Sequence, residues 1–326
     1  MLYFLIRSFL ICTIFIVATS ISSNAFAQQR WPSRAVRLVL PFGPASGADI
    51  AARILAEKMQ PIWGQAIVIE GKPGGDGLIS IGAVVSAKDD HILFFGPTSS
   101  YVVHPYMHDN LPYDPERDLT PIAGVAQVQI AIAVPTKLGL NSLQEFVDFA
   151  KKNSDKVSYG VAPGFSEFVF DGFKREQGLK IAKVPYRDIT TSPADLGEGR
   201  IQLGMMSYAA MRSTEELGTI KILAMNSAKR SQIAANIPSV VEAGFPGLVA
   251  SPILGLVGPR DMTRAIREKI ASDIGEVLKD PKVRERLNAS GQPAAFMDVE
   301  QFSLGISEQK DQVARIAKIL NMPRRQ

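Results

Sequence analysis

The sequence predicts an α/β fold divided between two lobes. Short apolar runs rich in β-branched residues alternate with helical patterns over nearly the whole chain. Such alternation favours helices packed on largely parallel sheets. The chain has 326 residues, and single hydrophobic cores stop growing at about 250–300 residues. The length therefore favours two lobes over one.

Residues 1–27 have the features of a secretory signal peptide. Arg7 supplies a positive charge, residues 8–19 are apolar, and Ala25-Phe26-Ala27 matches the small-x-small pattern of a cleavage site. The apolar stretch is shorter than the roughly 20 residues that span a bilayer. We therefore expect cleavage after Ala27, export to the periplasm, and a soluble mature protein.

Composition excludes several classes of function. Cys12 is the only cysteine, so the mature chain has no disulfide, thiol nucleophile or cysteine–metal site. The net charge of +4 is small and its charges are interspersed, so we expect no nucleic-acid partner. Pro105 interrupts the pair His104 and His108, and no dinucleotide or phosphate-loop motif is present. We expect no metal and no cofactor.

The first structural unit is a strand, a loop and a helix. Residues 36–40 are typical of a buried strand, and residues 50–59 carry Ile54, Leu55 and Met59 on one helical face. The intervening loop is rich in glycine and proline. A helix that starts after such a loop presents free N–H groups and partial positive charge, which suits an anion. The alternative is an ordinary connection capped by Ser46 or Asp49.

The other elements follow in the same way. The helix over residues 142–152 is typical, because Leu143, Phe146 and Val147 share one face and Ser142 or Asn141 caps its start. Helices are also predicted over residues 78–87, 168–177, 263–278, 281–289 and 299–320. Strands are predicted over residues 66–70, 92–96, 129–134, 157–161, 181–186, 201–206 and 220–225.

Two apolar extended runs, residues 130–135 and 253–259, each end at a proline. If both cross between lobes, residues 28–130 and 254–326 form lobe 1 and residues 131–253 form lobe 2. The alternative is that both runs are ordinary sheet strands, and composition does not separate the two interpretations.

Ten short runs together match one protein family. Two of them are Glu70-Gly-Lys-Pro-Gly-Gly75 and Val184-Pro-Tyr186. The full set comprises residues 31–34, 41–49, 70–75, 111–115, 159–160, 184–186, 226–230, 237–247, 258–259 and 280–287. Because they occur in the expected order over the mature chain, the sequence resembles the extracytoplasmic solute receptors of tripartite tricarboxylate transporters, called the Bug family.

This resemblance implies a type II periplasmic-binding-protein fold, with a ligand cleft between two α/β lobes. It implies a monomeric receptor, not an enzyme, that captures a small carboxylated solute and delivers it to inner-membrane permease subunits. One alternative is a sensor for a membrane histidine kinase. Another is an exported α/β hydrolase with Ser46 or Ser166 as nucleophile and His104 as base, although neither serine lies in a Gly-x-Ser-x-Gly elbow.

The resemblance also implies where the ligand lies. Two facing loops at helix starts, residues 42–49 and 161–166, would hold the carboxylate with backbone and hydroxyl donors, often through water. The strand-end loop of residues 98–101 would approach it with hydroxyl donors, the alternative being a capped turn. Arg187 could pair with it in bidentate fashion, the alternative being an ordinary surface arginine. The predicted site residues are Phe42, Gly43, Ala45, Ser46, Gly47, Ala48, Asp49, Thr98, Ser99, Ala162, Gly164, Phe165, Ser166, Arg187 and Tyr208.

The sequence departs from the family pattern at several of these positions. Ala48 replaces a threonine, Pro163 removes an N–H donor, and Val161, Phe165 and Val169 replace small or polar residues. Fewer donors and more apolar surface predict a carboxylate with a bulky apolar or aromatic body, in preference to citrate or a short dicarboxylate. Stronger thermal stabilisation by citrate or malate than by aromatic acids would reject that hypothesis.

Overall fold

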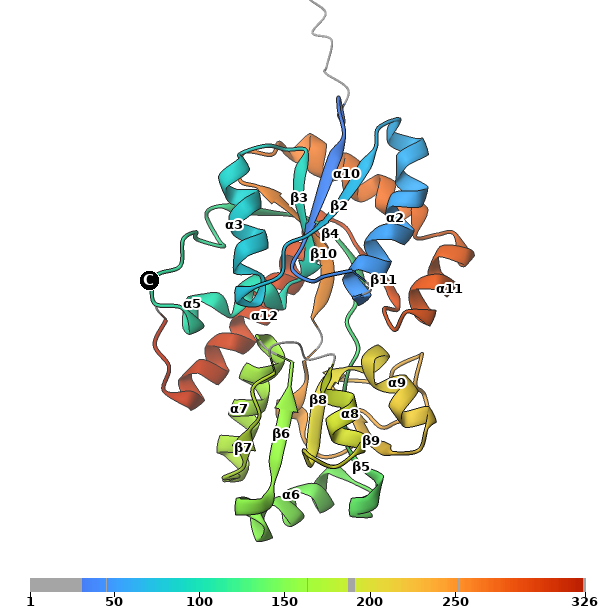
Figure 1. Ribbon diagram of the computed structural model, residues 1–326. Helices are drawn as coiled ribbons and strands as arrows, with labels where there is room; N and C mark the ends of the chain where they lie inside the picture. The colour runs from blue at the N-terminus through green and yellow to red at the C-terminus, as the bar shows by residue number, and fades with distance from the viewer. Residues whose placement is uncertain (1–30, 45, 163, 187–190, 251, 325–326) are drawn as a thin grey trace, which may run out of the picture.

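Two β-sheets organise the molecule, one above the other in Figure 1. The computed structural model describes residues 31–324 except residues 45, 163, 187–190 and 251. The predicted signal peptide lies outside the described residues. We call the part built on the six-stranded sheet lobe 1 and the part built on the five-stranded sheet lobe 2.

The sheet of lobe 1 has the order β11-β4-β10-β3-β1-β2. Its strands are β1 (Val36–Leu40), β2 (Ile67–Gly71), β3 (Ile92–Pro97), β4 (Leu119–Gln127), β10 (Ile253–Pro259) and β11 (Ala294–Met297). β1 pairs in parallel with β2 and β3, whereas β10 runs antiparallel to β3 and β4. The prediction of largely parallel sheets is therefore wrong for the half of this sheet that contains β4, β10 and β11.

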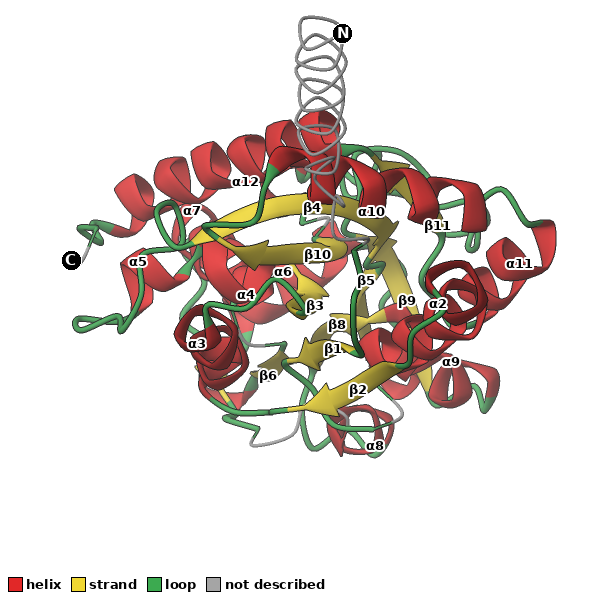
Figure 2. Ribbon diagram, turned by 90° about the horizontal axis from the view of Figure 1, so that it is seen from above, coloured by secondary structure: helices red, strands yellow, loops and turns green. Residues whose placement is uncertain are grey.

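Helices cover both faces of this sheet. They are α2 (Gly47–Trp63), α3 (Leu78–Ala87), α10 (Arg264–Val277), α11 (Pro281–Ala289) and α12 (Val299–Leu320). α2, α10 and α11 share one core with Leu38 and Leu40 of β1, and α3 and α12 pack into a second core with Val39. Seen from above, α2 and α3 lie on opposite sides of β1 (Figure 2).

The sheet of lobe 2 has the order β7-β6-β8-β5-β9. Its strands are β5 (Ile130–Pro135), β6 (Ser158–Val161), β7 (Ala182–Lys183), β8 (Leu203–Ser207) and β9 (Ile220–Met225), and its helices are α6 (Leu143–Lys152), α7 (Phe165–Gln177), α8 (Ser192–Gly197) and α9 (Tyr208–Glu216). β5 runs antiparallel to β8 and β9. Two short helices, α4 (Ser99–Val102) and α5 (His104–Met107), follow β3, and single 3₁₀ turns occur at Gly75–Gly77, Thr136–Leu138, Ser154–Lys156 and Pro246–Leu248.

The runs predicted as inter-lobe crossings are ordinary strands. Ile130–Pro135 is β5 of lobe 2 and Ile253–Pro259 is β10 of lobe 1. The chain changes sheets just before each run, between β4 and β5 and again between β9 and β10. The predicted lobe boundaries stay a prediction, which the strand membership of the two sheets supports.

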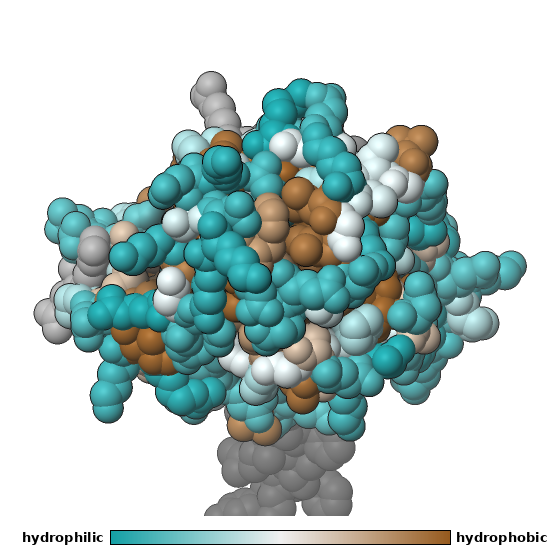
Figure 3. All heavy atoms as spheres, turned by 90° about the horizontal axis from the view of Figure 1, so that it is seen from below, coloured by the Kyte–Doolittle hydropathy of each residue, from teal (hydrophilic) through white to brown (hydrophobic). Residues whose placement is uncertain are grey.

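The exterior of the molecule is largely polar. In the view from below, polar residues cover most of the face and apolar residues lie in small groups among them (Figure 3). No helix in the described part of the chain is both long and apolar enough to cross a bilayer.

Candidate functional site

Two helix N-termini meet the boundary between the lobes. α2 begins at Gly47 in lobe 1 and α7 begins at Phe165 in lobe 2. The strands that lead into them, β1 and β6, point toward each other from opposite lobes (Figure 1). Because a helix N-terminus presents unpaired N–H groups and partial positive charge, this boundary suits an anion.

Ser46 is the N-cap of α2, as the alternative of an ordinary capped connection predicts. Its Oγ accepts a hydrogen bond from the backbone N–H of Asp49 at 3.2 Å, and its backbone is extended. Helix geometry leaves the N–H groups of Gly47 and Ala48 without an intrahelical acceptor. The capped helix therefore still offers two backbone donors and the hydroxyl proton of Ser46.

Asp49 does not face a ligand as a free carboxylate. Arg53 donates Nε–H and Nη2–H to its two oxygens at 3.0 Å each, and Asp49 is only 6% exposed. These hydrogen bonds raise the pKa of the Arg53 guanidinium above its usual value. The pair keeps the negative charge of Asp49 balanced beside the N-terminus of α2, so that this charge does not oppose a bound anion.

The preceding part of the first loop is open. Phe42 is 42% exposed, and nothing lies within 4 Å of where a Cβ at Gly43 would stand. Ala45 lies outside the described residues. This loop therefore combines one large apolar side chain with backbone that a solute can approach.

The N-terminus of α7 has no side-chain cap. Its N-cap, Gly164, has φ 80° and ψ −130°, a conformation that glycine adopts most readily. A Cβ at Gly164 would lie 3.8 Å from the carbonyl oxygen of Ser99 in lobe 1. Two predicted residues from different lobes, Ser99 and Gly164, thus lie close together.

Phe165 corrects one sequence prediction. Its side chain is fully buried in the core that also contains Phe168 and Val169, so it adds no apolar surface to the boundary. Val169 is equally buried, and Pro163 lies outside the described residues. The hypothesis of a bulky apolar ligand rests on Pro163, Phe165 and Tyr208; Phe165 no longer supports it, and Tyr208 stays a predicted contact. Ser166 is 4% exposed and stays a predicted contact through its backbone.

Thr98 and Ala162 are also corrected. The Thr98 hydroxyl donates to Oε1 of Gln309 at 2.5 Å and accepts from the backbone N–H of Ile253 at 3.1 Å. The backbone N–H of Thr98 donates to the Ile253 carbonyl, and that of Ala162 donates to the Met205 carbonyl at 2.9 Å. Neither residue therefore has a donor left for a carboxylate, because hydrogen bonds within the fold already use these donors.

Tyr208 lies at the start of α9 beside a turn from lobe 1. Its backbone N–H donates to the carbonyl of Gln129 at 2.8 Å, and burial raises the pKa of its hydroxyl. The phenol therefore stays protonated at neutral pH and can donate a hydrogen bond. A Cβ at Gly291 would lie 2.6 Å from Cβ of Ala209, so the turn of lobe 1 touches the first turn of α9. Arg187 lies outside the described residues.

Gln292 is a boundary residue that sequence reasoning missed. Its Nε2 lies 2.0 Å from where a Cβ at Gly47 would stand, and the residue is 4% exposed. It connects the N-terminus of α2 with the turn that touches α9. The signal in the sequence is weak: Gly291-Gln292-Pro293 after a predicted helix indicates a turn, but nothing local indicates what that turn meets.

One group in the described chain has the donor types of a metal site. Asp89, Asp90 and His91 hold ligand atoms within 4.8 Å of one another. Arg34 pairs with Asp89, His91 Nδ1 bonds to Asp90, and His91 Nε2 accepts the backbone N–H of Ser33. These bonds tie residues 33 and 34 to the turn before β3 and explain the cluster without an ion.

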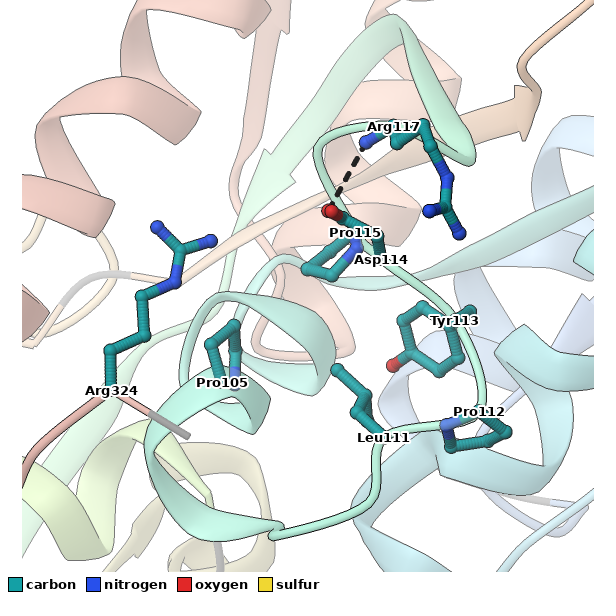
Figure 4. A pocket seen from close by; sticks show the side chains of 8 residues that line it. All are labelled: Pro105, Leu111, Pro112, Tyr113, Asp114, Pro115, Arg117 and Arg324. Carbon is teal, nitrogen blue, oxygen red and sulfur yellow. Dashed lines mark hydrogen bonds between the residues drawn. The ribbon is translucent and has the colours of Figure 1, made fainter. Parts of the chain in front are cut away.

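A cavity of about 540 Å³ lies between the segment that follows α4 and Arg324 near the C-terminus (Figure 4). It is lined by Pro105, Leu111, Pro112, Tyr113, Asp114, Pro115, Arg117 and Arg324. None of the predicted site residues that the structure describes lines it. Nearby, Nδ1 of the fully buried His104 lies 2.5 Å from the Tyr113 hydroxyl, so the sequence run that contains His104 and His108 is not simply a surface loop.

Comparison with known proteins gives a consistent result. The family model described as "Tripartite tricarboxylate transporter family receptor" matches residues 51–322. A UPF0065 protein of Bordetella bronchiseptica is 29% identical over 310 residues, covering 94% of this chain and 91% of the relative. Protein BugT of Bordetella pertussis is 27% identical over 282 residues, covering 85% of this chain and 86% of BugT.

Solved structures agree with the fold. The structure of R. palustris Rpa4515 with adipate superimposes with a TM-score of 0.80 at 25% identity, over 90% of this chain and 99% of that one. The periplasmic binding protein BugD gives a TM-score of 0.78 at 25% identity, over 91% of this chain and 100% of BugD.

Proposed function

This chain belongs to the family of tripartite tricarboxylate transporter receptors, which bind solutes and catalyse no reaction, and we propose that it holds a small carboxylate between the N-termini of α2 and α7. The observation that carries the proposal is that both helix starts lie at the boundary between the lobes, where Gly164 at the start of α7 lies near the Ser99 carbonyl of lobe 1. Backbone amides at two such termini bind a carboxylate without a cationic side chain.

The solute class follows from the donors and surfaces that remain. Gly47, Ala48 and the start of α7 supply N–H groups, and Tyr208 supplies a hydroxyl. Phe42 supplies exposed apolar area, which fits the carbon chain of an acid of the size of adipate, the acid in the Rpa4515 structure. Water bridges between amides and carboxylate extend this range at little cost in free energy.

The same proposal covers the export, location, partners and lobe boundaries of the receptor. Residues 1–27 direct export and are cleaved after Ala27, and the mature chain acts in the periplasm as a monomer. Loaded receptor delivers the solute to permease subunits of the inner membrane. The lobes are residues 28–130 with 254–326, and residues 131–253.

A thermal-shift screen tests the binding proposal. Mature protein is melted with adipate, benzoate, citrate and malate. At a concentration one hundred times the dissociation constant, a bound ligand stabilises by about 2.7 kcal/mol, so we expect at least one acid to raise Tm by about 5 °C or more. No shift with any carboxylate would contradict the proposal.

A charge variant locates the site. Ser99→Glu adds a carboxylate to a residue whose backbone carbonyl lies near Gly164, so we expect binding of the best acid to fall by about tenfold or more through repulsion. Ser154→Glu, in a 3₁₀ turn of lobe 2, is the control and should bind as the parent does. Equal binding by both variants would place the site elsewhere.

A further inference from the structure

The side chain of Gln292 occupies a position that packing alone does not explain. It follows α11 in a turn of lobe 1, and its amide rests against Gly47 at the N-terminus of α2. Any side chain at position 47 would collide with it, since the Cβ would stand 2.0 Å from Nε2. The preceding residue, Gly291, has φ 74° and touches α9 of lobe 2. Gln292 is thus held where both lobes and the α2 terminus meet.

Its amide oxygen is an unused acceptor. Gln292 is 4% exposed, and no donor in the described part of the chain bonds to Oε1. Leaving a buried acceptor unsatisfied destabilises a protein. Each such group in a native structure calls for an explanation, and at the lobe boundary a bound solute can supply the missing partner.

The backbone of Gln292 already performs the structural task of this turn. Its N–H donates to the Leu287 carbonyl at 3.0 Å and closes the end of α11. Any residue except proline makes that bond, so the turn does not require the glutamine side chain.

Resting on the proposed function, we propose that Gln292 is a specificity-determining residue whose Oε1 accepts a hydrogen bond from the solute. The amides of Gly47 and Ala48 hold the carboxylate, and Oε1 meets a donor on the neighbouring carbon. The solute class is therefore a carboxylic acid that carries a hydroxyl or ammonium group beside the carboxylate. An acid without that donor leaves Oε1 unpaired and binds more weakly.

The test uses acids that differ by one hydroxyl group. Calorimetry of the mature protein with succinate and malate, and with adipate and 2-hydroxyadipate, gives the preference within each pair. We expect the hydroxylated acid to bind about tenfold more tightly in at least one pair. Gln292→Met, of similar length and without hydrogen-bonding groups, removes that preference while binding of the unsubstituted acid changes less than about threefold.

Controls separate this role from others. Gln144→Met, at an exposed position of α6, keeps the preference. The Tm of ligand-free Gln292→Met stays equal to or above that of the parent, because an unsatisfied acceptor is removed; a large fall would indicate a structural role and overturn the inference. Equal binding within both pairs, or an unchanged preference in Gln292→Met, would also overturn it. Failure to bind every carboxylate would instead refute the proposed function, and this inference with it.

Discussion

Ser46 shows how one side chain serves both stability and binding. Its Oγ accepts from the N–H of Asp49, which satisfies one of the free donors at the start of α2, while its hydroxyl proton remains available to an anion at the same place. Ser142 caps α6 in the same way through the N–H of Glu145 at 3.1 Å. The two serines therefore make a matched pair, one at the lobe boundary and one remote from it.

Ser46→Ala and Ser142→Ala should each lower the free energy of unfolding by about 1 kcal/mol, the usual value of an N-cap. Urea unfolding monitored by circular dichroism measures this. Only Ser46→Ala should also weaken binding of the best carboxylate, because only that hydroxyl lies at the proposed site. A binding loss of similar size in Ser142→Ala would show that global stability, and not the site, sets affinity.

Among the helices, α7 and α12 join the lobes through a close approach at one glycine. A Cβ at Gly172 of α7 would lie 3.0 Å from Cγ2 of Ile316 on α12. Gly82 of α3 lies inside a helix as well, but nothing is within 4 Å of its Cβ position. Gly172 thus allows α7 to pack against α12. Gly82 only weakens α3, since glycine inside a helix is about 1 kcal/mol less stable than alanine.

We expect Gly82→Ala to stabilise the protein by about 0.5–1 kcal/mol. Gly172→Ala should gain less, and Gly172→Leu should destabilise by about 1–3 kcal/mol, because the larger side chain pushes α7 away from α12. Thermal and urea unfolding of the three variants check the order. Equal stabilisation by both alanine variants would mean that α7 and α12 are not closely packed at Gly172.

At the scale of the whole molecule, the two sides of the lobe boundary differ in how the lobes contact each other. On the side of α7 and α12, one apolar core runs from lobe 1 into lobe 2, with Phe302 and Ile316 in the same cluster as Phe165 and Phe170. On the side of α2 and α9, Gly291 lies against Ala209. Closure on a solute is therefore expected to change the α2 side most, since a close-packed core resists displacement.

Charge pairs in both lobes predict the response of the molecule to acid. Hydrogen bonds from Tyr186 and Arg200 lower the pKa of Asp195, and hydrogen bonds from Arg117 lower that of Asp118. A carboxyl group whose folded pKa is depressed contributes stability above its unfolded pKa, and that stability is lost as pH falls through the folded value. Burial raises the pKa of Glu215, so this one group makes the opposite contribution to the pH dependence of stability.

The free energy of unfolding should therefore decrease as pH falls from about 5 toward 3. This range includes the ordinary aspartate pKa of about 3.9. Asp195→Asn should be less stable than the parent at pH 6, and the difference should shrink toward pH 3, as pH falls toward the lowered folded pKa of Asp195. Asp155→Asn, at an exposed position, provides the control. A constant difference for Asp195→Asn between pH 6 and pH 3 would contradict the linkage.

The sequence by itself determined the elements whose signals are local. The bounds of α3, α11 and α12 agree with the predictions, because apolar periodicity, Pro281 at a helix start and glycine or asparagine at helix ends act within a few residues. The family and its two-lobed α/β fold followed from dispersed motifs and alternation. The predicted helix at 168–177 begins three residues earlier, at Phe165, because an uncapped start leaves no local signal.

Tertiary structure decided what depends on neighbours distant in sequence. β4 and α9 were missed and the predicted strand at 181–186 shrank to Ala182–Lys183, since strands gain their stability from pairing partners. Thr98 and Phe165 left the candidate site because Gln309 and the core engage them. Gln292 entered it because Gly47, far away along the chain, lies beneath its amide. Hydrogen-bond donors can be counted in a sequence, but only the folded chain shows which of them are already used.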